Sequence, residues 1–501
     1  MKKDTSNSFS GSGTDLGLEN MDYRYLSVAE GTKTVTNSSS FYGMISYFAK
    51  INYSYGSKYL FSATVRRDAS SRFGAKNNFG IFPSASLGWR ISQESFMEST
   101  RNWLSDLKLR ASYGINGNDQ ITANATYNLY SISLDNGSYN LSGDNKTLVA
   151  GTRRTRLGNE YLKWEETTQT NLGIDAAFLN NRLQFSFDWF NKDTDGMLYA
   201  PSVAGVIGEG STQYQNAAGL NNKGYEFVAN WRNTRGEFSY EISFNLAHYD
   251  NKLTYLPEEI YYSYGVGNGL DITNVGLPLN SLLGYVADGM FRTQAEVDEY
   301  NNMYTVSFGR PGVGRLRWAD VNEDGKITTA DRKVIGHTNP KLTGGLNFSA
   351  AYKGFDLSLF FNGMIRDSYN NSKYYTDLFQ NWTGNHSTRL LKALDAWKEY
   401  EQTGVYDCDI PALTTSTRNR EGSVTSTWQL ENGSFIRLKT ATLGYTLPAK
   451  VLNLFKLRQA RVYVQAQNIF TLTRYTGADP ENLGYAYPLP RTFTGGLTIG
   501  F

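Results

Sequence analysis

The sequence is poor in the residues that disulfide frameworks, zinc sites and histidine-dependent catalysis require. Cys408 is the only cysteine among 501 residues, so no disulfide can form within the chain and no CxxC pair indicates zinc. The three histidines, His248, His337 and His386, lie in separate segments. No GxSxG, HExxH or glycine-rich phosphate loop is present. These absences predict that the chain is not an enzyme.

A surplus of charge and long apolar runs are also missing. Lysine and arginine number 49 against 47 aspartates and glutamates, a formal net charge of +2, which predicts no nucleic-acid partner. No stretch approaches the roughly 18 consecutive apolar residues of a transmembrane helix. The opening MKKDTSNSFSGSGTD contains lysines but not the apolar run of a signal peptide. With a mean hydropathy of −0.46, these bulk values alone would suit a water-soluble protein.

Aromatic residues, in contrast, are abundant and regularly placed. They form 14% of the chain, with 35 tyrosines and 9 tryptophans. Apolar and polar residues alternate in LKLRASYGI (107–115), RLQFSFDWF (182–190), FSYEISFNLA (238–247) and the final RTFTGGLTIGF (491–501). A period of two is the pattern of a half-buried strand. It predicts an all-β fold.

The predicted strands are too long for an ordinary soluble β-sandwich. Most run ten residues or more, whereas globular strands favour about five or six and membrane-spanning strands need about nine to eleven. The thirteen predicted strands are 41–54, 58–69, 79–92, 107–117, 168–178, 182–192, 218–232, 237–250, 341–352, 355–364, 433–446, 458–470 and 491–501. Their lengths favour a membrane barrel.

The connections between these strands alternate in length. Short turns lie at 180–181, 233–236 and 353–354, and long polar segments at 118–167, 193–217, 251–340, 365–432 and 471–490. Outer-membrane barrels have short periplasmic turns and longer extracellular loops. We therefore predict a transmembrane antiparallel β-barrel over residues 41–501, with the long segments outside the cell. Residues 1–40 are expected to be a polar N-terminal segment, either a loop or a truncated strand region.

Two of the long loops contain helical patterns. Thr293 and Glu296 form a capping box that opens TQAEVDEYNNMY. In TRLLKALDAWKEY the apolar residues at helical spacing are Leu390, Leu391, Leu394 and Trp397. We expect short helices that pack within folded extracellular loops.

The segment DVNEDGKITTAD, residues 320–331, has the ligand spacing of an EF-hand-type calcium loop. The expected ligands are Asp320, Asn322 and Asp324 at positions one, three and five, the carbonyl of Lys326, and Asp331 at position twelve. Gly325 allows the turn at position six, and Ca²⁺ prefers six to eight oxygen ligands. Asp331 stands where a glutamate is usual, as in dockerin-type loops. We predict a structural calcium ion in the loop 251–340, with a polar surface turn as the alternative.

Eight segments resemble the SusC/RagA family of TonB-dependent outer-membrane transporters. They are RRDASSRFG (66–74), GIFPSASLGWRISQESFM (80–97), LKLRASYGINGN (107–118), LGNEYLKWEETTQTNLGID (157–175), DVNEDGKITTADRKVIG (320–336), YKGFDLSLFFNG (352–363), GSFIRLKTATLGYTLP (433–448) and QAQNIFTLTRYTGADPE (465–481). The resemblance implies a large barrel, plugged by an N-terminal domain and powered through the TonB system. It also implies a SusD-like surface lipoprotein as partner and the import of oligosaccharides or peptides.

The chain has no recognisable counterpart of the plug domain. Thirteen strands is an odd number, whereas a bacterial single-chain barrel has an even number, and plugged transporters of this size class have 22. We therefore expect a C-terminal portion of the barrel, with about nine strands and the plug encoded upstream or lost by truncation.

The expected function is TonB-dependent import of oligosaccharides or peptides across the outer membrane of a Gram-negative bacterium. The loop aromatics Tyr374, Tyr375 and Trp382 could stack on sugar rings or brace their own loop. Two alternatives stay open. One is a secreted, calcium-stabilised all-β protein that binds glycans. The other, less favoured, is an outer-membrane enzyme with its histidines or carboxylates gathered on one rim.

Overall fold

A single antiparallel sheet of fourteen strands forms most of the structure. The computed structural model describes residues 2–15, 25–133, 143, 149, 151–200, 213–256, 275–279, 281–307, 309–337, 339–369, 373, 377–379, 386–415, 424–482, 487 and 489–501. The strands follow one another in chain order as β1 (Lys2–Gly13), β2 (Lys33–Tyr55), β3 (Tyr59–Ser70), β4 (Phe79–Arg90), β5 (Leu104–Asn118), β8 (Glu165–Phe178), β9 (Leu183–Tyr199), β10 (Gln215–Arg235), β11 (Phe238–Tyr255), β18 (Leu342–Tyr352), β19 (Phe355–Ile365), β22 (Phe435–Thr446), β23 (Gln459–Thr473) and β24 (Thr492–Gly500). The all-β prediction is confirmed.

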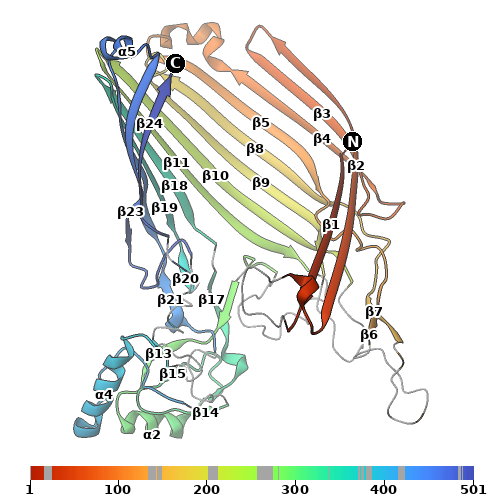
Figure 1. Ribbon diagram of the computed structural model, residues 1–501, viewed down its shortest axis with the longest axis vertical. Coiled ribbons are helices and arrows are strands. Elements are labelled where there is room, and N and C mark those ends of the chain that lie inside the picture. The colour runs from red at the N-terminus through yellow and green to blue at the C-terminus, as the bar shows by residue number, and fades with distance from the viewer. Residues whose placement is uncertain are drawn as a thin grey trace.

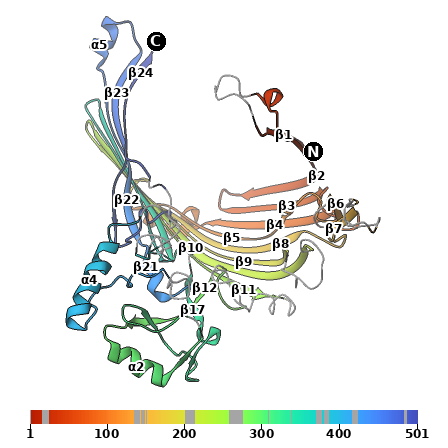
Figure 2. The same cartoon turned by 60° about the horizontal axis from the view of Figure 1, so that its bottom comes forward.

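The sheet is a tall, curved wall whose strands mostly run obliquely (Figure 1). Figure 2 shows the wall bending along its width between β2 and β24. No pairing joins β1 to β24 among the residues described, so the wall is open along these two edges. Inside the wall each strand pairs with both neighbours, which satisfies the backbone N–H and C=O groups as a lipid environment requires.

The two faces of the wall differ in polarity because the strand register keeps like residues together. On one face, Ile174, Phe187, Phe227 and Leu246 stand directly opposite one another on four successive strands. This is the apolar face. On the other, the polar face, Asp175 stands opposite Ser186 one residue along. The register confirms the predicted alternation across strand boundaries.

Aromatic side chains collect on the apolar face at the end with the short turns. Trp103 stacks on Phe178 with ring centroids 5.8 Å apart, and the indole N–H of Trp231 donates to the Tyr240 hydroxyl at 3.0 Å. Further ring pairs at this end are Tyr55–Tyr59, Phe238–Tyr352 and Phe355–Tyr445. Aromatic girdles mark the membrane interfaces of transmembrane barrels. This end is therefore the periplasmic interface of the wall.

Glu94, in the connection between β4 and β5, ties part of this girdle together. Its carboxylate accepts hydrogen bonds from the Tyr59 hydroxyl at 2.7 Å, the Lys58 ammonium at 3.0 Å and the Trp89 indole N–H at 3.1 Å. These donors lower the pKa of Glu94 from 4.5 to about 2. The contact is therefore fully present above the ordinary carboxylate pKa and is lost as the pH falls through about 2.

The fourteen strands are one more than the thirteen predicted. The additional strand, β1, pairs with an early part of β2 from Lys2–Met44 to Gly13–Lys33. Its sequence KKDTSNSFSGSG has one large apolar residue, Phe9, so it carries no apolar row that periodicity could detect. Residues 1–40, predicted as a polar segment, thus include strand β1 and the start of β2, and the parity argument built on thirteen strands does not apply.

The long connections fold at the opposite end of the wall, where Figure 1 shows most of the helices. The elements there are β6 (Leu129–Ser133), β7 (Gly151–Arg156), β12 (Ser281–Gly284), β13 (Ala287–Met290), α2 (Gln294–Met303), β14 (Thr305–Val306), β15 (Leu316–Trp318), β16 (Lys326–Ile327), β17 (Lys333–His337), β20 (Asp367–Tyr369), α4 (Leu390–Thr403) and β21 (Leu430–Asn432). At the end with the turns lie the short α5 (Ala449–Leu454) and two 3-10 helices of the β4–β5 connection, η3 (Ile91–Gln93) and η4 (Ser95–Thr100). Both predicted loop helices are confirmed, as α2 and α4.

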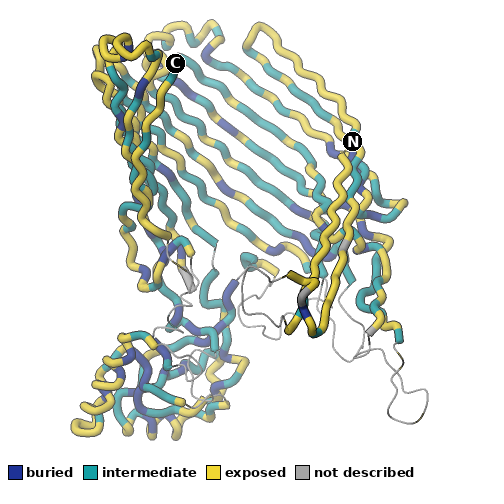
Figure 3. The backbone as a smooth tube through the Cα atoms, in the orientation of Figure 1, coloured by how far each residue is buried: buried dark blue, intermediate teal, exposed yellow. Residues whose placement is uncertain are grey.

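Buried residues are concentrated at the loop end, whereas most of the wall is intermediate or exposed (Figure 3).

The predicted cap of α2 is present, since the Thr293 hydroxyl accepts the Glu296 N–H at 3.3 Å. In α4, Leu390 is buried but Leu391 and Leu394 are exposed. No helix within the described ranges is both long and apolar enough to cross a bilayer.

We predict that Phe244→Arg impairs membrane assembly far more than Ser243→Arg. Phe244 lies on the apolar face near the middle of β11, opposite Leu346, while the adjacent Ser243 lies on the polar face opposite Asn347. A charge at mid-bilayer on the lipid face costs roughly 2–4 kcal/mol. The measurement is the fraction of heat-modifiable barrel in outer membranes. Equal losses from the two variants would contradict the assignment of the faces.

Candidate functional site

The polar face carries a row of small neutral groups across five strands. Asn52, Ser62, Ser86, Ser112 and Asn171 stand directly opposite one another from β2 to β8. Hydroxyl and amide groups donate and accept hydrogen bonds without bringing charge. This neutral row can therefore exchange water for the polar groups of a solute.

A compact ion-pair cluster lies next to the neutral row. Arg110 donates from Nε to Asp175 at 2.7 Å and from Nη2 to Asp188 at 2.9 Å, and Lys108 lies 3.5 Å from Asp175. A Cβ atom at Gly173 would lie 2.7 Å from the Arg110 guanidinium carbon, so glycine gives the guanidinium room to cross the strand. Two cations face two carboxylates, and the cluster adds no net charge to the face.

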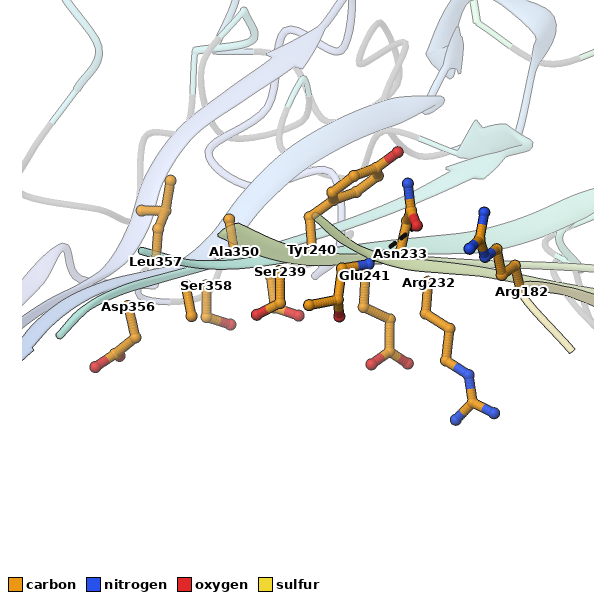
Figure 4. A pocket seen from close by; sticks show the side chains of 13 residues that line it. Arg182, Arg232, Asn233, Ser239, Tyr240, Glu241, Ala350, Asp356, Leu357 and Ser358 are labelled. Atoms are coloured by element: carbon orange, nitrogen blue, oxygen red, sulfur yellow. Dashed lines mark hydrogen bonds between the residues drawn. The ribbon is translucent and has the colours of Figure 1, made fainter. Parts of the chain in front are cut away.

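A hollow of about 570 Å³ lies on the sheet near the periplasmic end. Arg232, Glu241, Asp356 and Ser358 extend to one side of the sheet there, while Tyr240 points to the other (Figure 4). Arg232 and Glu241 are direct cross-strand partners. This part of the polar face therefore carries charges of both signs.

Two loops from different parts of the chain fold into one body, the loop module, formed by residues 281–337 and 390–412. Its core contains Tyr285, Phe291, Val297, Tyr300, Val313, Leu316, Trp318 and Ile327 from the first loop, and Ala396, Tyr406 and Ala412 from the second. The Tyr406 N–H donates to Arg292 O and the Ala412 N–H to Gly314 O, both at 2.8 Å. Backbone pairing and a shared core thus make the two loops one unit.

Buried tyrosines brace the loop module. The Tyr300 hydroxyl donates to Trp318 O at 2.6 Å, and the Tyr406 hydroxyl donates to Ile410 O at 2.7 Å. Burial raises the pKa of both hydroxyls well above the ordinary tyrosine value. Both therefore stay protonated and keep donating at physiological pH.

The predicted calcium loop lies in this module, and three of its five predicted ligands come together. The Asp324 N–H lies 3.3 Å from Asp320 Oδ1 and 3.2 Å from Asn322 Oδ1, and the Asn322 amide donates to Asp324 Oδ2 at 3.1 Å. The Gly325 N–H donates to Asp320 Oδ2 at 2.8 Å, and its φ of +73° suits the turn. The side-chain oxygens at positions one and three of the loop therefore converge on the backbone N–H at position five.

Asp331 is engaged differently from the other predicted ligands. Its side chain is fully buried and accepts the N–H groups of Val321 at 3.0 Å and Thr328 at 2.7 Å, so it ties the two ends of the loop together. The described residues contain no group of three or more histidine, cysteine, aspartate or glutamate side chains arranged to hold a metal. The fit to a cation therefore depends on amide and carbonyl oxygens in addition to Asp320 and Asp324.

Lys326 was predicted to contribute its backbone carbonyl. The carbonyls on either side of it, of Gly325 and Ile327, accept N–H groups from Thr305 and Ser307 at 3.1 and 3.0 Å. Because carbonyls alternate in direction along a strand, the Lys326 carbonyl points away from β14. It is not used by this strand pair.

A buried ion pair that periodicity did not reveal fixes the last loop to the wall. Arg437 on β22 is 3% exposed and donates to Asp479 at 2.7 Å and to Glu481 at 2.8 Å. Burial raises the pKa of Asp479, but hydrogen bonds from the Glu481 N–H and from Arg437 outweigh it and leave that pKa below its ordinary value. In the sequence, the feature that could have indicated this ion pair is Arg437 itself, an arginine at a polar-face position of a predicted strand.

The three histidines do not form a cluster. His248 contacts Lys341 O at the outer end of β11, His386 packs on Phe379 with ring centroids 4.8 Å apart, and His337 ends β17. Tyr374, Tyr375 and Trp382, the candidate sugar-stacking residues, lie outside the described residues.

Comparison with known proteins identifies relatives over nearly the whole chain. The family model described as "TonB dependent receptor-like, beta-barrel" matches residues 2–469. TonB-dependent receptor P3 of Formosa agariphila is 34% identical over 510 residues, covering 96% of this chain and 48% of the relative. TonB-dependent receptor SusC of Bacteroides thetaiotaomicron is 32% identical over 471 residues, covering 91% and 44%. The chain thus spans about half the length of the curated relatives it matches.

Solved structures give the same result for the fold. The RagAB peptide importer in its "closed-closed" state superposes with a TM-score of 0.81 at 26% identity, covering 100% of this chain and 52% of that one. The "open-open" state gives a TM-score of 0.77 at 25% identity. These relatives are receptors and importers of the Gram-negative outer membrane, not enzymes. The chain belongs to the TonB-dependent receptor-like β-barrel family, with relatives of the SusC and RagA type.

Proposed function

We propose that the protein containing this chain imports a bulky polar solute, an oligosaccharide or a peptide, across the outer membrane with energy delivered through TonB. The observation that carries the proposal is the polar face, which continues from strand to strand behind an apolar, aromatic-rimmed face. In this account the chain supplies the C-terminal part of a barrel whose polar face lines the passage. Peptide is the class named for the RagAB structures.

The side chains of the polar face suit passage rather than tight retention. The neutral row from Asn52 to Asn171 offers exchangeable hydrogen bonds, and the charges of Arg110 are already compensated by Asp175 and Asp188. A solute that leaves water can therefore replace its hydrogen bonds along the neutral row and meets Arg110 with its charge already compensated. Such a surface is expected to be tolerant of solute size and sequence.

The remaining parts of the machinery are proposed to lie outside this chain. A plug domain and the TonB contact would come from the rest of the protein, since the chain spans only about half of its relatives. A SusD-like surface lipoprotein would sit on the loop end, where the loop module offers a folded platform. The resemblance to the SusC/RagA family supports this pairing.

We also propose that the loop 320–331 binds a structural calcium ion. Asp320, Asn322 and Asp324 would supply side-chain oxygens and Lys326 its carbonyl, while Asp331 closes the loop at position twelve. A bound Ca²⁺ would neutralise the clustered carboxylates and stiffen the segment. The convergence of the first three residues supports the proposal.

We predict that Ser86→Trp lowers uptake severalfold, because it places a large ring on the neutral row. Leu87→Trp, on the adjacent apolar-face position, is the matched control and should leave uptake unchanged. Initial uptake of labelled oligosaccharide and peptide mixtures by cells is the measurement, with barrel assembly checked in each variant. Uptake that persists at the same rate without TonB would overturn the proposed function.

For calcium, Asp320→Ala and Asp324→Ala should abolish saturable Ca²⁺ binding and increase proteolysis between β11 and β18. Glu323→Gln is the control. Glu323 stands at position four, so this substitution removes one charge from the loop without removing a predicted ligand. Calorimetric titration of the purified protein checks the prediction. An unchanged titration in both alanine variants would show that the loop is a polar turn.

A further inference from the structure

One arginine lies on the apolar face, in the middle of otherwise uncharged neighbours. Arg67 on β3 stands directly opposite Tyr47 on β2 and Ile81 on β4. Val65 and Ala69, two residues away on the same strand, share its face because side chains alternate along a strand. Arg67 therefore points toward the side that the wall presents to lipid.

The preceding arginine behaves in the opposite way. Arg66 points to the polar face, where it donates to Asp68 at 2.7 Å and to Ser46 at 3.2 Å. Arg67 forms no ion pair with any carboxylate in the described part of the chain. The two adjacent arginines thus differ in face and in charge compensation.

The guanidinium of Arg67 lies over an aromatic ring. Its central carbon lies 4.0 Å from the ring centroid of Phe79, a residue of the apolar face of β4. Stacking of this kind holds a guanidinium in place while the N–H donors at its edge stay available. The neighbouring Tyr47 and Ile81 are 64% and 59% exposed, so the edge of the guanidinium is open.

The height of Arg67 on the wall places it near the outer headgroups. Tyr59 belongs to the periplasmic girdle, and Arg67 follows it by eight residues on the same strand. At about 3.3 Å per residue and a tilt near 40°, the two lie roughly 20 Å apart along the membrane normal. The apolar band of an outer-membrane barrel is about 25 Å tall.

We propose that Arg67 is a lipid-binding residue that holds a phosphate group of an outer-leaflet lipid against the barrel. A cation at this height requires a counter-charge, and the described residues of this chain supply none. The planar fork of N–H donors matches phosphate oxygens, and charge-assisted contacts of this kind are short and strong. Val65, two residues closer to the bilayer centre, and Ile81, directly opposite Arg67, are apolar and fit the acyl chains of the same lipid.

The test uses the full-length protein purified in detergent and native mass spectrometry with added lipid A, in its bis-phosphorylated and dephosphorylated forms. The wild type should retain the phosphorylated form, and Arg67→Gln should reduce retention at least tenfold. Arg67→Lys, which keeps the charge but not the fork, should give an intermediate value. Arg153→Gln, which removes an exposed cation from the extracellular strand β7, is the matched control and should bind as the wild type.

Three results would overturn the proposal. One is equal retention of phosphorylated lipid by the wild type and Arg67→Gln. The second is equal retention of the phosphorylated and dephosphorylated forms by the wild type. The third is displacement of the lipid by millimolar inorganic phosphate, which would indicate a site for free anions. If Arg67→Gln does not assemble, Phe79→Leu, which removes the stacking platform, should still weaken retention of the phosphorylated form alone.

Discussion

A polypeptide in a bilayer must pair every backbone N–H and C=O group within itself, and the rest of this structure depends on that constraint. Inside the wall the strands meet it by pairing in chain order, so that each connection needs only to reach the adjacent strand. At Lys353–Gly354, positive φ angles of +48° and +87° close such a connection in two residues. The same pairing fixes the register, which separates the aromatic lipid-facing side from the hydroxyl-rich and charged side.

The loops outside the membrane meet a different requirement. They have no lipid to bury their apolar residues and must build cores of their own. The loop module solves this by combining residues 281–337 with 390–412 around Ile327 and Tyr406, both fully buried. The buried pair of Arg437 and Asp479 similarly fixes the last loop to β22. At the loop end of the wall, the polar face is therefore bordered by folded loops.

The sequence predicted the strands of the wall better than the folded loops at its outer end. Alternation in 182–190 and 238–247 identified strands and faces, since lipid on one side and polar surroundings on the other impose a period of two. It did not identify β1, whose serines and asparagines give no apolar row. It could not reveal the union of two loops that β18 and β19 separate in the chain, because that contact is set by tertiary packing. In the segment 320–331, spacing indicated that Asp320, Asn322 and Asp324 lie together, whereas the capping role of Asp331 depends on backbone groups that spacing does not show.

Cysteine scanning along β11 in the full-length protein measures, for each residue, both its depth in the membrane and the face of the sheet on which it lies. Replacement by serine of Cys408, the only cysteine of this chain, and of any cysteine elsewhere in the full-length protein provides the background for single cysteines from Phe238 to Tyr255. A fluorophore at each position is exposed in turn to lipid-borne and water-borne quenchers. The account predicts lipid quenching at even positions such as 242, 244 and 246, and water quenching at 241, 243 and 245. Quenching without a period of two along this strand would contradict the membrane wall itself.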